Sequence, residues 1–216
     1  MPRFAVSLLF ALLWSTAAPA QTTAYANHDE AHRGLAAAEA GQRADAVVWL
    51  ATHGSAADEE DLRQRLRDDS PLVRGLAERG LWLLWGRSGD EAIDNLMAKG
   101  AQQMQARQFD EAIATYSDVI RLKPAFAEGW NKRATVLFLA GDYKRSLADC
   151  DEVTKRNPHH FGALAGYGQI YFQLKQFDKA IDYWKRALKV NPNMDGVQDS
   201  IELTEKLMAE RRKQSA

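Results

Sequence analysis

The chain has 216 residues, of which 46% are hydrophobic, and its formal net charge is −1. A hydrophobic fraction of this size is enough for a packed core, and the near-neutral charge gives no broad attraction to nucleic acid or to an anionic membrane. Cys150 is the only cysteine, so an internal disulfide is excluded and stability must come from packing.

The segment 1–20 predicts a cleavable secretory signal peptide. Arg3 supplies its positive start and residues 4–14 form a mostly apolar run, while Ala18-Pro19-Ala20 fits the cleavage rule, with the cut before the next residue. The run is too short to span a bilayer comfortably, so we expect no stable membrane insertion after cleavage; an uncleaved anchor is the alternative. The short signal and the Ala-rich composition suggest export to a bacterial periplasm. Residues 21–27 are expected to be a disordered leader.

Residues 28–90 show helical periodicity and no strand-like alternation. The predicted helices are His28–Ala40, Ala44–Thr52, Asp58–Arg67 and Leu72–Trp85, with a break at residues 41–43. Ser70 is a candidate N-cap for the last helix, and Pro71 fits its first position. The pattern around this helix resembles the inner helix of a HEAT-type repeat, at Asp69, Pro71, Val73, Arg74, Ala77, Leu81 and Leu84. We therefore expect a HEAT-like helical region over 28–90, which covers one end of the array that follows.

Three consecutive windows of equal length repeat one pattern along the chain. The windows are Ile93–Phe126, Ala127–His160 and Phe161–Met194, and each closes on a proline, at Pro124, Pro158 and Pro192. Proline ends a helix because it cannot donate the backbone hydrogen bond that would continue it. A strict period of this length predicts a solenoid of stacked helix pairs.

The residue types inside each window resemble the tetratricopeptide (TPR) repeat. Small residues stand at positions 8 and 20, and aromatic residues stand at positions 17 and 24 except for Cys150. The other departures are Gln103 at position 11, where the family has a bulky residue, and valine at position 27 of the first two units, where it has a small one. The small side chains are those of Gly100, Ala134, Gly168, Ala112, Ser146 and Ala180, and position 24 is taken by Tyr116, Cys150 and Trp184. The resemblance implies an all-α fold, a right-handed superhelical solenoid of antiparallel helix pairs. It has three TPR units, over 93–126, 127–160 and 161–194, and an amphipathic capping helix is expected over 195–212.

The resemblance also implies that the first helix of each unit lines a concave groove. The groove residues that we expect to bind a partner are Met97, Met104, Asn131, Thr135, Phe138, Gln169, Phe172 and Gln173. Methionine, phenylalanine and small residues suit an apolar helix or an extended peptide, and about half of the groove positions are expected to be structural. Phe138 and Phe172 lie one full period apart, so we expect adjacent aromatic anchors.

TPR proteins that bind chaperone tails use a two-carboxylate clamp, and this chain does not carry it. The resemblance places the clamp at Met97, Ala101, Lys132, Gly162 and Gly166, none of which matches the family pattern of Lys, Asn, Asn, Lys and Arg. Recognition of a C-terminal carboxylate by that mechanism is therefore not expected.

The sequence also contains histidines and tryptophans that are candidates for metal or partner binding. His28 and His32 are four apart on a helix and could share a metal, but no matching ligand pair is evident, so we expect a solvated helix face and no metal. His159 and His160 are expected in a surface loop. One of Trp82 and Trp85 could be core and the other an exposed anchor.

No catalytic motif or cofactor-binding loop is found in the sequence. We therefore expect a non-catalytic scaffold or adaptor of the periplasm, without a cofactor, which binds a protein or peptide and not nucleic acid. The alternative is a self-associating subunit, a homo-oligomer, of an envelope-assembly or enzyme complex.

Overall fold

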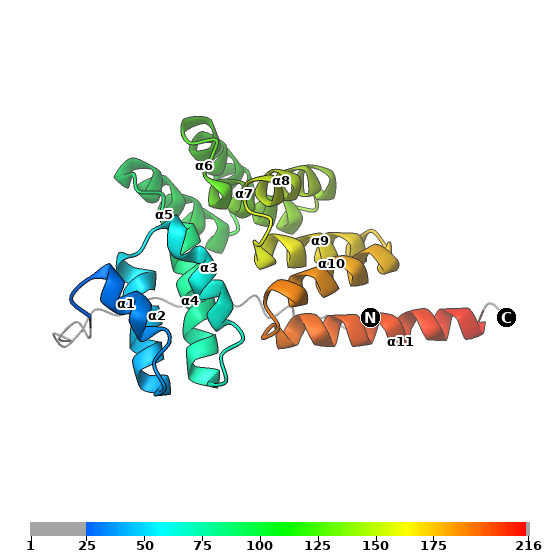
Figure 1. Ribbon diagram of the computed structural model, residues 1–216. Coiled ribbons are helices and arrows are strands. Elements are labelled where there is room, and N and C mark those ends of the chain that lie inside the picture. The colour runs from blue at the N-terminus through cyan, green and yellow to red at the C-terminus, as the bar shows by residue number, and fades with distance from the viewer. Residues whose placement is uncertain (1–24, 215–216) are drawn as a thin grey trace.

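The computed structural model describes residues 25–214, and every regular element in that range is helical (Figure 1). The predicted signal peptide, residues 1–20, lies outside the described residues. The elements are α1 His28–Gly34, α2 Ala40–His53, the 3-10 turn η1 Ala56–Asp58, α3 Glu59–Arg65, α4 Pro71–Gly86, α5 Glu91–Gln105, α6 Phe109–Leu122, α7 Ala127–Leu139, α8 Tyr143–Arg156, α9 Phe161–Gln173, α10 Phe177–Val190 and α11 Asp195–Gln214. Among residues 25–214, no helix is long and apolar enough to cross a membrane.

Helices α5 to α10 form the predicted solenoid. Each repeat window is one pair of helices, α5 with α6, α7 with α8 and α9 with α10, and successive pairs pack through α6 on α7 and α8 on α9. Figure 1 shows the three pairs stacked from green to orange along one curved array. The all-α class and the stacked helix pairs are therefore confirmed.

Close approach of the two helices in a pair depends on the small residues. A Cβ atom at Gly100 would lie 2.6 Å from the ring of Tyr116, and one at Gly168 would overlap the ring of Trp184. Real Cβ atoms do not come this close, so glycine lets the aromatic ring of the second helix pack onto the backbone of the first. In the middle pair, the hydroxyl of Ser146 donates to the carbonyl of Ala134 at 2.8 Å. The predicted register of the repeat is therefore the observed one.

The turn inside each pair uses a left-handed residue at the same position. These residues are Arg107, Gly141 and Lys175, with φ of 59°, 83° and 60°. Each is bracketed by two backbone hydrogen bonds back to the preceding helix, as in a Schellman motif. Glycine adopts this conformation without strain, whereas Arg107 and Lys175 carry a steric cost at Cβ.

The N-terminal helices differ from prediction at their first joint. The expected break at residues 41–43 lies instead at 35–39, and Gly41 is inside α2, because a glycine in the first turn is only a weak helix breaker. The buried guanidinium of Arg43 holds the real joint, since it donates to the carbonyls of residues 37 and 38 and pairs with both carboxylate oxygens of Asp68 at 2.8 Å. Tyr25, expected in the disordered leader, packs on this region and donates its hydroxyl to the carbonyl of Gln42 at 2.8 Å.

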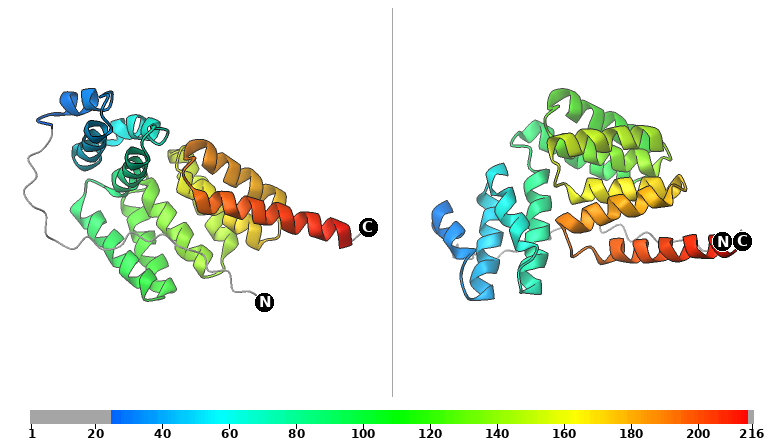
Figure 2. Two further views of the ribbon diagram at one scale, coloured as in Figure 1. Left: turned by 90° about the horizontal axis from the view of Figure 1, so that it is seen from below. Right: turned by 45° about the vertical axis from the view of Figure 1, so that its right-hand side comes forward.

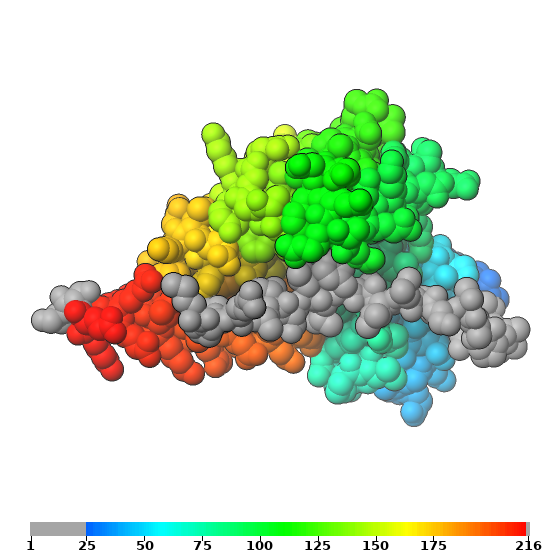
Figure 3. Space-filling model, turned by 180° about the vertical axis from the view of Figure 1, so that it is seen from behind, coloured from blue at the N-terminus to red at the C-terminus, as the bar shows by residue number. Residues whose placement is uncertain are grey.

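The N-terminal region lies across the array, not simply at its end. Among the described residues, the main contact of α4 with the repeats is with α7 in the second unit. The loop before α4 also reaches the third unit, where Asn193 donates its side-chain amide to the carbonyl of Leu66 at 2.8 Å and Arg67 donates to the carbonyl of Val190 at 3.2 Å. Seen from behind, these helices (blue to cyan) lie below the first repeats (green) (Figure 3).

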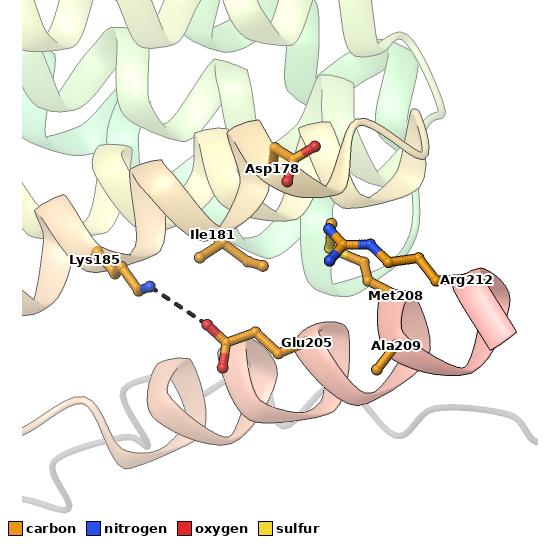
Figure 4. Close-up of a pocket in the computed structure, with 7 residues that line it drawn as sticks. All are labelled: Asp178, Ile181, Lys185, Glu205, Met208, Ala209 and Arg212. Carbon is orange, nitrogen blue, oxygen red and sulfur yellow. Dashed lines mark hydrogen bonds and ion pairs between the residues drawn. The ribbon is translucent and has the colours of Figure 1, made fainter.

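Helix α11 covers the last pair, as expected, and ends at Gln214. Val197, Ile201 and Thr204 bury its inner side against α10. The far half of α11 extends away from the N-terminal region (Figures 1 and 2). A shallow cleft of about 320 Å³ separates it from α10 and is bridged by the ion pair of Lys185 and Glu205 at 3.4 Å (Figure 4).

The left-handed turn positions generate a stability prediction. Replacing Lys175 with glycine should raise the free energy of unfolding by about 0.5–1 kcal/mol, because relief of the left-handed strain exceeds the added chain entropy of glycine. Replacing Gly141 with alanine, at the same position of the second unit, should lower it by about 1–2 kcal/mol. Thermal melts followed by circular dichroism measure both. A destabilised K175G together with an unaffected G141A would contradict the turn assignment.

Candidate partner-binding face

We define the inner face as positions 2, 5, 6, 9, 12 and 13 of the first helix in each unit, on α5, α7 and α9. Equivalent positions of stacked units project in the same direction, so they form rows across the three helices. One row holds Met104, Phe138 and Phe172, and another holds Ala101, Thr135 and Gln169. The predicted partner-binding residues all belong to these positions.

Two of the predicted contacts are buried in the folded chain. Met104 is 5% exposed and packs in the core of the first pair with Tyr116 and Val136. Asn131 is 8% exposed and donates its amide to a carboxylate oxygen of Glu128 at 3.0 Å. The half-buried Met97 packs against the same core as Met104. Met104 and Asn131 are therefore framework residues, which corrects their prediction as partner contacts.

The two predicted aromatic anchors are half-buried and lie in different clusters. The ring centroid of Phe138 is 5.7 Å from that of Tyr143. The ring of Phe172 is 5.5 Å from Phe177 and 6.0 Å from Trp184. Each ring therefore packs between the two helices of its own pair, and part of it remains exposed. A role for that exposed part in binding stays a prediction.

Three polar residues of the inner face can still form hydrogen bonds outside the chain. The hydroxyl of Thr135 donates to the carbonyl of Asn131 at 3.0 Å, so its oxygen remains able to accept. Within the described part of the chain, the side-chain amides of Gln169 and Gln173 have no hydrogen-bond partner, and Gln173 is exposed. Glutamine amides supply both donors and acceptors, which suits the backbone of an extended peptide.

A buried carboxylate lies at the other end of α7. Glu128 is 2% exposed; one of its oxygens pairs with the ammonium of Lys132 at 3.0 Å, and the other accepts from the ring nitrogen Nε2 of His160 at 3.0 Å. The ring nitrogen Nδ1 of His160 accepts from the backbone N–H of Ala163 at 3.1 Å. Since Nδ1 is an acceptor, the proton of the neutral imidazole must be on Nε2, where it is donated to Glu128.

Electrostatics at this cluster favour the ionised carboxylate. Burial alone would raise the pKa of Glu128, but the charge of Lys132 and the hydrogen bond from His160 lower it to about 2. Tyr116, which faces the same carboxylate from α6, has its pKa raised by burial and by the negative charge of Glu128. Glu128 is therefore a buried carboxylate whose charge is compensated by its neighbours.

Helix α4 packs directly on this cluster through two tryptophans. Trp85 is 9% exposed and stacks on His160 with ring centroids 4.3 Å apart. Trp82 is half-buried; it meets His160 edge-on at 5.4 Å and contacts Gly162 so closely that a Cβ atom there would overlap its ring. Neither tryptophan is an exposed anchor, and His160, expected in a surface loop, is fully buried. Both corrections follow from the docking of α4, which connects segments far apart in the chain.

The docked helix limits what the inner face can offer. Trp82 covers Gly162 and lies with its ring 5.9 Å from the ammonium of Lys132. Gly162 and Lys132 are two of the five positions where the resemblance places the family's carboxylate clamp. The open part of the inner face is therefore the end farther from α4, around Thr135, Gln169 and Gln173.

Comparison with known proteins agrees with the observed geometry. Two models of the tetratricopeptide repeat match the chain, over residues 98–154 and 164–194. A TPR repeat-containing protein of Rhizobium etli is 33% identical over 149 residues, which cover 68% of this chain and 73% of that protein. The chain therefore belongs to the TPR repeat family. Hsp70-Hsp90 organizing protein 1 of Glycine max is 25% identical over 113 residues, and the match covers 20% of its length.

Solved structures share the fold. The Sgt2 TPR domain from Aspergillus fumigatus has a TM-score of 0.54 at 19% identity and covers 57% of this chain and 83% of that one. MamA from Desulfovibrio magneticus has a TM-score of 0.51 at 19% identity, and the match covers 72% of this chain and 86% of that one. The first TPR of Spaghetti (RPAP3), bound to the HSP90 peptide SRMEEVD, has a TM-score of 0.52 at 21% identity. That match covers 54% of this chain and 93% of the other. At these identities the likeness establishes a common fold.

The lowered pKa of Glu128 generates a pH prediction. A carboxyl whose pKa is lower in the folded chain stabilises the fold above its ordinary pKa of 4.5, and this contribution is lost as pH falls toward about 2. The variant Glu128→Gln should therefore cost about 3 kcal/mol of unfolding free energy at pH 7 and distinctly less at pH 3. Urea unfolding of the wild type and the variant at pH 7 and pH 3 measures the difference in their unfolding free energies. The contributions of the other carboxylates are common to both proteins and cancel in that difference. A difference that does not change with pH would contradict this assignment.

Proposed function

We propose that the chain is a non-catalytic scaffold that binds a protein partner as an extended, uncharged peptide segment along the open part of the inner face. The observation that carries this proposal is the pattern of side chains there. Among residues 25–214 the amides of Gln169 and Gln173 have no hydrogen-bond partner, and Phe138 and Phe172 are half-buried on the same face. Amide groups can bind the peptide backbone, while half-exposed rings can contact its apolar side chains.

The proposed ligand is an internal segment, not an acidic C-terminus. The first TPR of Spaghetti is described as bound to SRMEEVD, and the TPR2B domain of yeast Sti1 as a complex with an Hsp70 peptide. In this chain the residues at the clamp positions do not supply free cations, because Lys132 pairs with Glu128 and Gly162 lies under Trp82. Binding through a terminal carboxylate would lack its electrostatic partner.

A charge-insertion experiment tests the binding face. The double variant Gln169→Lys, Gln173→Lys should lose the partners that wild-type protein captures from an extract of the native cells. It should keep its melting temperature, since one residue is exposed and the other half-buried. Two unpaired ammonium groups at a contact cost about 2 kcal/mol or more of binding free energy, which corresponds to a roughly 30-fold loss of capture.

The matched control places the same charges on the second helices of the repeat. Ala114→Lys and Ala148→Lys are exposed positions on α6 and α8, and this double variant should capture partners normally. Equal capture by both double variants would reject the inner face as the binding surface. The self-associating alternative makes a different prediction, since the purified chain would then elute as a dimer or larger species without any partner.

We further propose that the protein is exported to the periplasm of a bacterium. The support is the order of features in residues 1–20, from Arg3 through the apolar run to Ala18-Pro19-Ala20. The expected mature chain begins at Gln21. Mass spectrometry of the N-terminal peptide from fractionated cells tests this, and a cytoplasmic or membrane-bound form that retains Met1 would contradict it.

A further inference from the structure

Three metal-ligating side chains meet in the N-terminal region, away from the inner face. His28 and His32 are one turn apart on α1, so they share a face of that helix. The 3-10 turn η1 brings Asp58 against them; its oxygen Oδ1 lies 2.7 Å from Nε2 of His28 and 2.8 Å from Nε2 of His32. The two nitrogens and the oxygen all lie within 4.8 Å of one another, which is close enough for one ion to contact all three.

The carboxylate of this group is held in place before any ligand arrives. Asp58 is 1% exposed, and its second oxygen Oδ2 accepts from the backbone N–H of Ser55 at 2.6 Å as part of a capping box. Oδ1 is thereby left facing the two imidazoles. The carboxylate is therefore held in one orientation, with one oxygen directed at the two histidines.

A second carboxylate, that of Asp61, lies near the other ring nitrogen of His32. The nitrogen Nδ1 of His32 lies 3.3 Å from an oxygen of Asp61, while Nε2 points at Asp58. A neutral imidazole carries one proton, so it can satisfy only one of these two carboxylates, and the other nitrogen would present a lone pair to a lone pair. Either a second proton or a metal ion on Nε2 removes this conflict; with a metal ion there, the single proton stays on Nδ1 and faces Asp61. Ligating histidines in metal sites show this carboxylate–histidine arrangement.

We propose that His28, His32 and Asp58 bind one divalent transition-metal ion of the zinc class. Two imidazole nitrogens and one carboxylate oxygen are the donor set that zinc accepts, and three protein ligands leave a fourth position for water or an outside group. The side chains of His28 and His32 are 50% and 31% exposed, so that position faces solvent. Tetrahedral ligands at about 2.0–2.1 Å from zinc are roughly 3.3 Å apart. Each histidine nitrogen must therefore move about 0.5 Å away from Oδ1 of Asp58, and both rings are partly exposed and can rotate.

The bound ion would fasten α1 to η1. Helix α1 has only 7 residues, too few to be stable alone, and it packs mainly on α2. The ion would add a link to the turn that precedes α3. The prediction from sequence, a solvated helix face without a metal, missed this arrangement because Asp58 is 30 residues from His28 along the chain.

Isothermal titration of the metal-free full chain with zinc sulfate tests the site. Wild-type protein should bind one equivalent of zinc, with a rise in melting temperature that a chelator reverses. His28→Gln and His32→Gln should each abolish this binding, and both are expected to fold because these side chains are partly exposed. Asp61→Asn leaves the three ligands in place and should weaken zinc binding about 10-fold through the lost support of His32. His159→Gln, at an exposed histidine of the repeat array, is the control and should bind zinc as the wild type does.

Two outcomes would overturn the proposal. Undiminished zinc binding by the His28→Gln and His32→Gln variants would place the ion elsewhere. No binding by a wild-type chain whose metal-free melt is normal would mean that the histidines are held by Asp58 as a protonated pair, without an ion. Substitution with cobalt gives an independent readout, since tetrahedral coordination at the proposed ligands should produce visible absorption that H32Q lacks.

Discussion

The buried carboxylate of Glu128 is the interaction on which the arrangement of the two regions depends. It joins α7 to the turn before α9 through His160, and the stacked ring of Trp85 carries that contact on to α4. A buried charge is tolerated only when it is fully paired, and here Lys132, His160 and Asn131 pair it completely. Loss of Lys132 would leave an uncompensated charge between the N-terminal helices and the repeats, and loss of His160 or Asn131 would remove a hydrogen bond to the buried carboxylate. The aromatic contact between α4 and the array therefore depends on a histidine ring that the buried carboxylate holds in place.

This docking decides which part of the TPR surface remains available. In a free-standing repeat array the whole concave side could face a ligand, but here Trp82 covers the first turn of α9 and approaches Lys132. Two of the five positions that correspond to the family's carboxylate clamp, Lys132 and Gly162, therefore lie against Trp82. Gln169 and Gln173, whose amides have no hydrogen-bond partner in the described part of the chain, lie in the second half of α9. The same N-terminal helices hold the candidate zinc ligands, so one region both narrows the binding face and carries a separate site.

The repeats could be predicted from sequence because their contacts recur with the period of the chain. Once Ala180 is placed one period after Ser146, its neighbours follow from the unit before, and both small side chains are buried as the pattern requires. Which inner-face positions are free was not predictable, since the burial of Met104 depends on a neighbouring helix. Contacts between the N-terminal helices and the repeats could not be predicted from the repeat pattern. Trp85 lies outside the repeated windows, so the spacing of the repeats gives no indication that it stacks on His160.

The central claim is that a partner contacts the open end of the inner face, and site-specific photocrosslinking in the native cells tests it most directly. A benzophenone side chain at position 173, which is exposed on α9, should give a covalent adduct with a partner on irradiation. The same side chain at position 182, exposed on α10, should give none or far less. Adducts formed from position 182 and not from position 173 would contradict the account, because the partner would then contact the outer helices of the repeat.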